Sequence, residues 1–227
     1  MISLTEAASA LQDFEKGDLS ERIGAMEAIL KGADASRLEA AFPHLGSGNR
    51  LLEAALTLKA AAGQVNVLIH AIGILLAIPK ILSQGEQVIS LSLGAGSTGI
   101  PFDLETTLRV SEFKFIRWRG ASEAIRQNSL FKDFYLLAEY ETQKLKELYV
   151  IGTEHPLKFL HGGRALSSVM SRNNRLWAEF QRRYGARFST VSDYYTYRKS
   201  QVSIKDLTSV IPMLSQPPPS DEEEESI

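Results

Sequence analysis

Apolar residues recur at helical spacing through the first part of the chain. Alanine and leucine dominate a long segment from Arg50 onward, which predicts a helix that is interrupted at Gly63 and ends near Pro79 or at residues 83–85. Before it, three pairs match a capping box or its aspartate variant and predict short helices: Ser3 with Glu6, Asp18 with Glu21, and Ser36 with Glu39. The glycine-rich residues 46–49 mark a soft boundary between these two regions.

Alternation of apolar and polar residues begins after this long helix. Residues 87–93 alternate strictly and predict a strand, and two further strands are predicted at residues 102–108 and 109–118. Residues 121–146 return to helical spacing, and residues 148–151 predict a fourth strand. The order α-β-β-β-α-β predicts an α/β fold, in which a central mixed β-sheet is flanked by helices and preceded by an N-terminal helical extension.

The C-terminal part has a different composition. Residues 173–214 show helical patches rich in arginine and tyrosine, whereas residues 216–226 contain three prolines followed by five consecutive acids. A segment of that composition cannot bury a core, so we expect a disordered acidic tail. The predicted organisation is a helical extension (residues 1–48), a core domain with C-terminal helices (49–214) and the tail (215–227).

The amino-acid composition excludes several kinds of functional site and shows an uneven distribution of charge. The chain has no cysteine, which excludes disulfides, thiolate zinc sites, iron–sulfur clusters and cysteine nucleophiles. Its net charge of −2 hides an uneven distribution. Residues 1–40 hold eight acids and four bases, residues 109–132 hold six bases and two acids, and residues 144–187 hold nine bases and three acids. The basic middle can attract phosphates, although such stretches are also common on solvated surfaces.

Targeting signals are not evident. The first residues show neither a basic start nor an apolar core, so we expect no signal peptide. The most apolar stretch, residues 65–82, is interrupted by polar residues, glycine and proline, and its uninterrupted part is shorter than the roughly 20 residues that a bilayer requires. We therefore expect a buried helix, a cytoplasmic location and no membrane partner.

Two familiar patterns are weak here. Gly94, Gly96 and Gly99 match a dinucleotide fingerprint, but a predicted strand follows them where the fingerprint needs a helix, so we interpret them as a hairpin turn. The chain has four histidines, at no spacing typical of a zinc hydrolase, and His70 is expected in the core.

The informative segment is the predicted hairpin. Side chains alternate between the faces of a strand, so Glu112 and Lys114 share one face and Phe113 points the other way. If the two strands pair around residues 106–109, Asp103 comes near Glu112. Two carboxylates beside a lysine suit Mg²⁺ or Mn²⁺, which needs few protein ligands and can activate a water for phosphodiester hydrolysis. The alternative is an ordinary solvent-exposed strand face on which glutamate and lysine alternate.

This pattern resembles the PD-(D/E)xK nuclease superfamily, the restriction-endonuclease-like proteins, over about residues 50–160. A Pro-x-Asp is followed nine residues after the aspartate by Glu-x-Lys, inside an α-β-β-β-α-β run. The resemblance implies that Asp103 and Glu112 are metal ligands and that Lys114 is the catalytic lysine. It also implies a further metal ligand on the first core helix, for which Glu53 is the candidate.

The chain departs from the family pattern in two places. The proline precedes Phe102 rather than the aspartate. Gln127 begins a Gln-x-x-x-Phe where some branches have Gln-x-x-x-Tyr, so the resemblance makes it a candidate on the substrate side. The flanking basic residues are candidate phosphate contacts or solvated surface residues: Arg117, Arg119, Arg126 and Lys132. Tyr194, Tyr195 and Tyr197 are candidates for base stacking or for packing.

The sequence thus predicts a Mg²⁺- or Mn²⁺-dependent nuclease that hydrolyses phosphodiester bonds of nucleic acid, with DNA as the expected substrate. The resemblance allows a homodimer, and the acidic tail is a candidate site for a protein partner. Two alternatives stay open: a non-catalytic interaction or nucleic-acid-binding protein that retains the fold, and an unrelated α/β core in which Glu-x-Lys is incidental.

Overall fold

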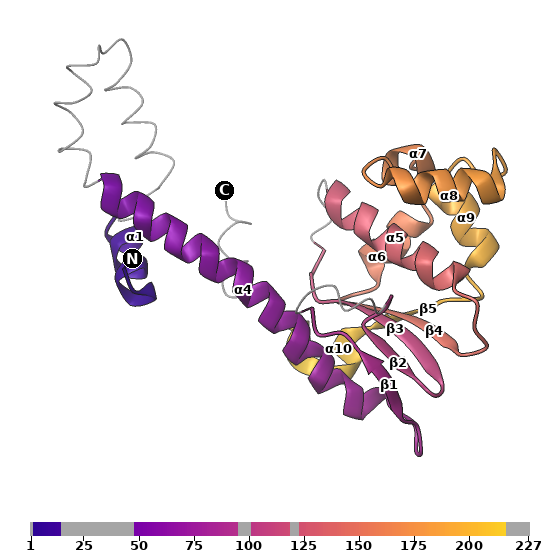
Figure 1. The fold of residues 1–227 in the computed structure, drawn as a ribbon, viewed down its shortest axis with the longest axis horizontal. Helices are drawn as coiled ribbons and strands as arrows, with labels where there is room; N and C mark the ends of the chain where they lie inside the picture. Colours follow the sequence, from indigo (N-terminus) through magenta and orange to yellow (C-terminus); the bar gives the residue numbers. More distant parts are fainter. Residues whose placement is uncertain (1, 15–47, 95–100, 119–122, 217–227) are drawn as a thin grey trace, which may run out of the picture. The chain divides into compact units, whose positions relative to one another are not determined.

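The computed structural model describes residues 2–14, 48–94, 101–118 and 123–216. The chain divides into two compact units, Met1–Leu68 and Ile69–Ile227. The division falls inside the long helix α4 (Gly48–Ile81), whereas the sequence predicted a boundary at the glycine-rich residues 46–49. The helix also continues past Gly63 without the predicted interruption (Figure 1). The two capping pairs at residues 18–21 and 36–39, and the acidic tail from residue 217, lie outside the described residues.

In the first unit, α1 (Leu4–Phe14) begins at a capping box, as its sequence predicts. The Ser3 N–H donates to Glu6 Oε2 at 2.8 Å, and the Glu6 N–H donates to Ser3 Oγ at 3.2 Å. Ala7 on α1 and Ala54 on α4 are both fully buried. The Ile2 N–H donates to the Glu53 carboxylate at 3.2 Å. Glu53 therefore has a structural contact within this unit.

The second unit is built on one mixed sheet of five strands in the order β1-β2-β3-β4-β5. Its strands are β1 (Val88–Leu91), β2 (Leu104–Thr106), β3 (Arg109–Lys114), β4 (Leu145–Val150) and β5 (Ser203–Asp206). The first three strands are antiparallel neighbours, and β3, β4 and β5 run parallel. α5 (Ala124–Glu139) connects β3 to β4. The predicted α-β-β-β-α-β order and the α/β class are confirmed, whereas β5 lies in a region where only helices were expected.

Helices cover both faces of this sheet (Figure 1). The larger core joins α5 to the C-terminal helices α6 (Glu154–Leu160), α7 (Leu166–Val169), α8 (Asn174–Tyr184) and α9 (Val191–Arg198). The smaller core joins the end of α4, through Ile74 and Ala77, to the sheet and to α10 (Leu207–Val210). A short 3-10 helix, η2 (Pro212–Ser215), follows.

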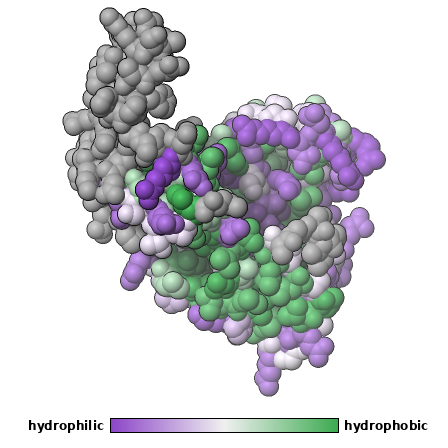
Figure 2. Space-filling view, turned by 60° about the vertical axis from the view of Figure 1, so that its left-hand side comes forward, coloured by the Kyte–Doolittle hydropathy of each residue, from purple (hydrophilic) through white to green (hydrophobic). Residues whose placement is uncertain are grey.

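The exposure of α4 corrects the expectation of a buried helix. Of the part of the chain that the structure describes, Arg50–Ile81 is the one helix that is long and apolar enough to cross a membrane, and only 11% of its most apolar window is buried. Only the face of its last turns packs on the sheet. Figure 2 shows a broad hydrophobic area on the surface of the molecule. Length and composition by themselves therefore do not reveal what surrounds this helix.

A buried ion network closes the turn end of the β2–β3 hairpin. The Arg109 guanidinium donates to both oxygens of Glu86, at 2.7 and 2.8 Å, and to Glu147 at 2.9 Å. The side chains of all three residues are at most 8% exposed. The bond from Arg109, which outweighs the opposing effect of burial, lowers the pKa of Glu86 to about 2. This network ties β3 to β4 and to the segment that precedes β1.

Candidate functional site

The β2–β3 hairpin brings the two predicted metal ligands to the same place. Leu104 pairs with Ser111 and Glu105 with Val110, so the antiparallel register extended by one residue sets Asp103 across from Glu112. The Phe113 N–H donates to Asp103 Oδ2 at 2.8 Å, which fixes the aspartate at the start of β2. The hairpin expected from the sequence is confirmed.

Alternation along β3 separates the polar side chains from the core. Phe113 is fully buried and stacks on Tyr149 of β4, with ring centroids 4.8 Å apart. Glu112 and Lys114 emerge on the other face, where Lys114 Nζ lies 2.8 Å from Glu112 Oε1. Their side chains are 14% and 23% exposed, so this is not the freely solvated strand face of the alternative interpretation.

Asp133 of α5 completes the cluster, although it was not among the site residues predicted from the sequence. Its Oδ2 lies 2.7 Å from Lys114 Nζ. Burial alone would lower the pKa of Lys114, but the charges of Asp133 and Glu112 outweigh burial and raise it. A signal was present in the sequence: Asp133 sits among Leu130, Phe134 and Leu137, at the spacing of the inward face of a helix.

Glu112 has an unusual environment for a carboxyl group. Burial is the main cause that raises its pKa to about 7, and the charges of Asp133 and Asp103 add to the increase, while Lys114 opposes it. The group therefore exchanges its proton near neutral pH. Glu112 thus lies close to two other carboxyl groups and to one lysine, and such a group of acids favours an additional positive charge.

His70 is the second residue whose role the sequence did not reveal. Its Nε2 lies 3.1 Å from Asp103 Oδ1, and its side chain is 25% exposed rather than part of the core. α4 reaches this position because Gly73 allows close packing on Phe115: a Cβ at Gly73 would lie 2.3 Å from the Phe115 ring. The imidazole also meets the Phe115 ring edge-on, with centroids 5.8 Å apart. His70 thus orients the Asp103 carboxylate from α4.

The donor set fits a hard divalent cation. Asp103 and Glu112 offer carboxylate oxygens, and Mg²⁺ or Mn²⁺ is commonly held by one or two such groups with water filling the other positions. Among the described residues, no three His, Cys, Asp or Glu side chains form a ready-made metal cage. Any cation bound here would therefore rely on Asp103, Glu112 and water.

The candidate substrate-side residues have varied surroundings. Gln127 accepts a hydrogen bond from Arg164, and Arg126 pairs with Glu123. Arg117 donates to the backbone oxygens of Leu214 and Gln216 and so anchors the end of the chain that the structure describes. Lys132 is exposed on α5. Arg119 lies outside the described residues, and Glu53 belongs to the first unit.

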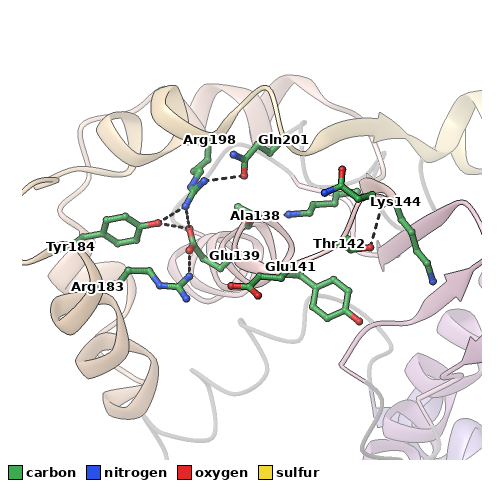
Figure 3. Close-up of a pocket in the computed structure, with 12 residues that line it drawn as sticks. Ala138, Glu139, Glu141, Thr142, Lys144, Arg183, Tyr184, Arg198 and Gln201 are labelled. Atoms are coloured by element: carbon green, nitrogen blue, oxygen red, sulfur yellow. Dashed lines mark hydrogen bonds and ion pairs between the residues drawn. The ribbon is translucent and has the colours of Figure 1, made fainter.

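A separate pocket of about 900 Å³ opens at the end of α5 and is lined by charged side chains (Figure 3). Glu139 lies at its centre: the hydroxyls of Tyr184 and Tyr194 donate to it at 2.6 and 2.5 Å, and Arg198 pairs with it at 3.0 Å. Burial raises the pKa of Glu139, but these hydrogen bonds and that from Arg183 outweigh it and lower the pKa. The carboxylate is consequently satisfied within the protein.

The tyrosines near this pocket divide into two kinds. Tyr194 is fully buried and Tyr195 is 7% exposed, so both pack in the larger core. Tyr197 is 42% exposed, and the guanidinium groups of Arg187 and Arg198 lie over its ring at 4.4 and 4.8 Å from the centroid. Of the three, only Tyr197 is an exposed residue, and its ring contacts these two guanidinium groups.

The chain matches no protein-family model, no curated protein and no solved structure. The feature of the described residues that bears on function is the cluster formed by His70, Asp103, Glu112, Lys114 and Asp133.

Proposed function

We propose that this protein is a nuclease that hydrolyses phosphodiester bonds of nucleic acid with the help of Mg²⁺ or Mn²⁺, and that DNA is its substrate. The observation that carries the proposal is the convergence of Asp103 and Glu112 beside Lys114 on the β2–β3 hairpin. The pKa of about 7 for Glu112 adds to it, because perturbed carboxyl groups in polar clusters are typical of functional sites.

The residues of the cluster have separate tasks in this reaction. Asp103 and Glu112 hold the cation. When bound, the cation supplies an activated water and neutralises charge on the phosphoryl oxygens. Lys114 places its ammonium beside Glu112, where it orients the attacking water and stabilises negative charge that develops on the phosphate. Asp133 and His70 position Lys114 and Asp103, respectively.

The test is cleavage of plasmid and linear DNA by the purified full-length chain, with Mg²⁺, Mn²⁺ or EDTA, and with RNA as a competing substrate. We expect cleavage that depends on the metal and is lost in Asp103→Asn and in Lys114→Met, which keeps the volume of the lysine stem. Glu141→Gln and Lys199→Ala are the controls, because they remove an exposed acid and an exposed base in place of Asp103 and Lys114. Both control variants should cleave DNA like the unmodified chain. Circular dichroism confirms that each variant is folded.

One observation favours a second candidate function, a non-catalytic protein that retains this fold. Lys114 already pairs with two carboxylates, and Asp103 already bonds His70 and the Phe113 N–H. A purely structural cluster would look the same. It predicts no cleavage with any metal and full retention of nucleic-acid binding in Asp103→Asn, and that result would contradict the nuclease proposal. Cleavage that survives Asp103→Asn and Lys114→Met together would contradict the assignment of the active site to this cluster.

A further inference from the structure

The pocket at the end of α5 carries more basic than acidic side chains. Its lining comes from the end of α5 and the start of β4, from the end of α8, and from the end of α9 with the residues that follow it (Figure 3). A pocket in which bases outnumber acids attracts anions rather than cations. The charged lining residues are the bases Lys144, Lys146, Arg183 and Arg198 and the acids Glu139 and Glu141.

The two acids do not cancel this positive charge. Glu139 is the shared partner of Arg183 and Arg198, so one carboxylate faces two guanidinium groups. Glu141 is an exposed residue, and water and salt screen the charge of such a group. The Nε of Arg198 is buried without a hydrogen-bond partner among the described residues. Contacts within the protein therefore leave part of the positive charge of the pocket without a negative partner.

Lys146 differs from the other bases of the pocket. Its Nζ donates to the backbone oxygen of Ala138 at 3.0 Å, and no carboxylate of the described residues forms an ion pair with it. The neighbouring Lys144, by contrast, pairs with Glu105 at 2.5 Å. Burial lowers the pKa of Lys146, and the positive charge of Arg198 lowers it further. Two cations that repel each other in a half-buried pocket are both stabilised when an anion binds between them.

This pocket is separate from the candidate nuclease site. In the parallel pairing of β3 with β4, Lys146 lies across from Val110 near the start of the strands, whereas Lys114 lies across from Val150 at their end. No residue of the cluster around Lys114 lines the pocket. A ligand in the pocket therefore occupies a second site at the other end of these two strands.

A phosphate group suits these side chains. It carries up to two negative charges and several acceptor oxygens, and guanidinium and ammonium groups are its usual partners in proteins. The pocket volume of about 900 Å³ is that of a small-molecule site and leaves room for a molecule larger than phosphate itself. We propose that this pocket binds the phosphate group of a small molecule through Lys146, Arg183 and Arg198. The site does not depend on the proposed nuclease activity.

The test is isothermal titration calorimetry of the full-length chain with inorganic phosphate, with deoxyadenosine monophosphate and with deoxyadenosine, which lacks the phosphate. EDTA in the buffer removes divalent cations, so a phosphate held through a metal at the nuclease site does not contribute. We expect both phosphates to bind and deoxyadenosine not to bind. Tighter binding of the monophosphate identifies a nucleotide-sized ligand, whereas equal affinities of the two phosphates identify free phosphate as the ligand.

Variants of Lys146 connect this binding to the pocket. Lys146→Met removes the ammonium and keeps the aliphatic stem, so it should weaken the binding of both phosphates by about 10- to 100-fold, the contribution of a hydrogen bond from a charged group. Lys146→Arg keeps the charge and should bind more tightly than Lys146→Met. Lys205→Met is the matched control, because Lys205 is an exposed lysine on the adjacent strand β5 and does not line the pocket. It should bind like the unmodified chain.

Urea unfolding distinguishes a binding role of Lys146 from a purely structural one. Added phosphate should stabilise the unmodified chain and Lys205→Met, because a ligand that binds only the folded state shifts the unfolding equilibrium, and it should stabilise Lys146→Met less. Without phosphate, Lys146→Met should unfold at a similar urea concentration to the unmodified chain, since burial and Arg198 already oppose the charge of Lys146.

Several results would overturn the proposal. They are the absence of phosphate binding to the unmodified chain at millimolar concentration, equal affinities in Lys146→Met and the unmodified chain, the same loss of affinity in Lys205→Met, and equal binding of deoxyadenosine and its monophosphate. Binding of a single-stranded oligonucleotide without binding of either small phosphate would also overturn it, because the pocket would then serve nucleic acid rather than a small molecule.

Discussion

Asp133 of α5 and Lys114, the last residue of β3, form an ion pair with 2.7 Å between Oδ2 and Nζ. Lys114 also pairs with Glu112 at 2.8 Å, so its ammonium is held from two elements. A lysine with one partner can rotate about its flexible stem, whereas two partners on different elements restrict its position. The helix after the hairpin therefore takes part in the site that the hairpin builds.

Replacing Asp133 tests this restriction. In Asp133→Asn, Lys114 keeps only Glu112 as an ionic partner, and we expect cleavage to fall by about 10- to 100-fold through misplacement of the ammonium. Removal of the Asp133 charge also lowers the pKa of Glu112, so the pH profile of cleavage should move to lower pH. Cleavage assays across pH measure both effects. Asp133→Glu should restore part of the activity, and an unchanged pH profile in Asp133→Asn contradicts the coupling.

Stability should depend on pH through Glu112. Its pKa is about 7 in the folded protein and near its ordinary value of 4.5 when the chain unfolds. Between these values the folded state binds the additional proton, so the free energy of unfolding decreases as pH rises from about 4.5 to 7, by roughly 1–3 kcal/mol. Urea unfolding at a series of pH values measures this. Glu112→Gln should flatten the dependence, and an equally steep one in that variant would exclude Glu112 as its source.

The affinity for the metal should also depend on the protonation of Glu112, but it should increase with pH, whereas the stability decreases. A carboxyl group must be ionised to bind a cation, so binding releases the Glu112 proton below pH 7. We expect the Mn²⁺ affinity to rise by about tenfold for each pH unit up to about 7 and to level off above it. Isothermal titration calorimetry in buffers of different ionisation enthalpy detects the released proton. No proton release at pH 6 would show that Glu112 is not a ligand.

His70 should contribute to metal binding without contacting the metal. It bonds Asp103 Oδ1 at 3.1 Å, and partners that orient a ligating carboxylate contribute about 10- to 100-fold to metal affinity. His70→Ala should weaken Mn²⁺ binding by that factor, and His70→Gln, which can still donate a hydrogen bond, should weaken it less. Calorimetric titration gives both constants. Equal affinities in His70→Ala and the unmodified chain would limit this histidine to packing on Phe115.

The network at the other end of the hairpin should govern stability rather than activity. Arg109→Met leaves the buried carboxylates of Glu86 and Glu147 without their cation, which we expect to cost about 3–5 kcal/mol of unfolding free energy. Lys144→Met breaks the ion pair between Lys144 and Glu105, whose side chains are 22% and 23% exposed. This change should lower the free energy of unfolding by less than about 1 kcal/mol. Urea unfolding at neutral pH compares the two. Similar losses would mean that burial adds little to the Arg109 network.

The hairpin was predictable because its signal is local. Strict alternation fixes which side chains share a face, and the short turn fixes the register, so the proximity of Asp103 to Glu112 follows from residues 103–112 alone. The short strand β5 was missed because its four residues, Ser203–Asp206, become a strand only through parallel pairing with β4. Nothing within four residues distinguishes them from a loop.

The remaining site residues depend on contacts between distant segments. His70 and Asp103 are separated by 33 residues, and Lys114 and Asp133 lie on different elements. Periodicity shows that Asp133 faces inward, but it does not show which strand residue it meets. The expectation that α4 is buried was wrong for a related reason. Its composition shows only that the helix is apolar, whereas its exposure depends on which of its faces the sheet covers.

The central place of β3 in the sheet has a consequence for how the chain tolerates change. β3 pairs with β2 on one side and β4 on the other, so its register is fixed twice. Insertion or deletion of a single residue there would turn Phe113 outward and bring a charged neighbour into the hydrophobic interior. The position of Glu112 and Lys114 is therefore coupled to the stability of the fold, since a shift of these two residues along β3 also displaces Phe113 from the core.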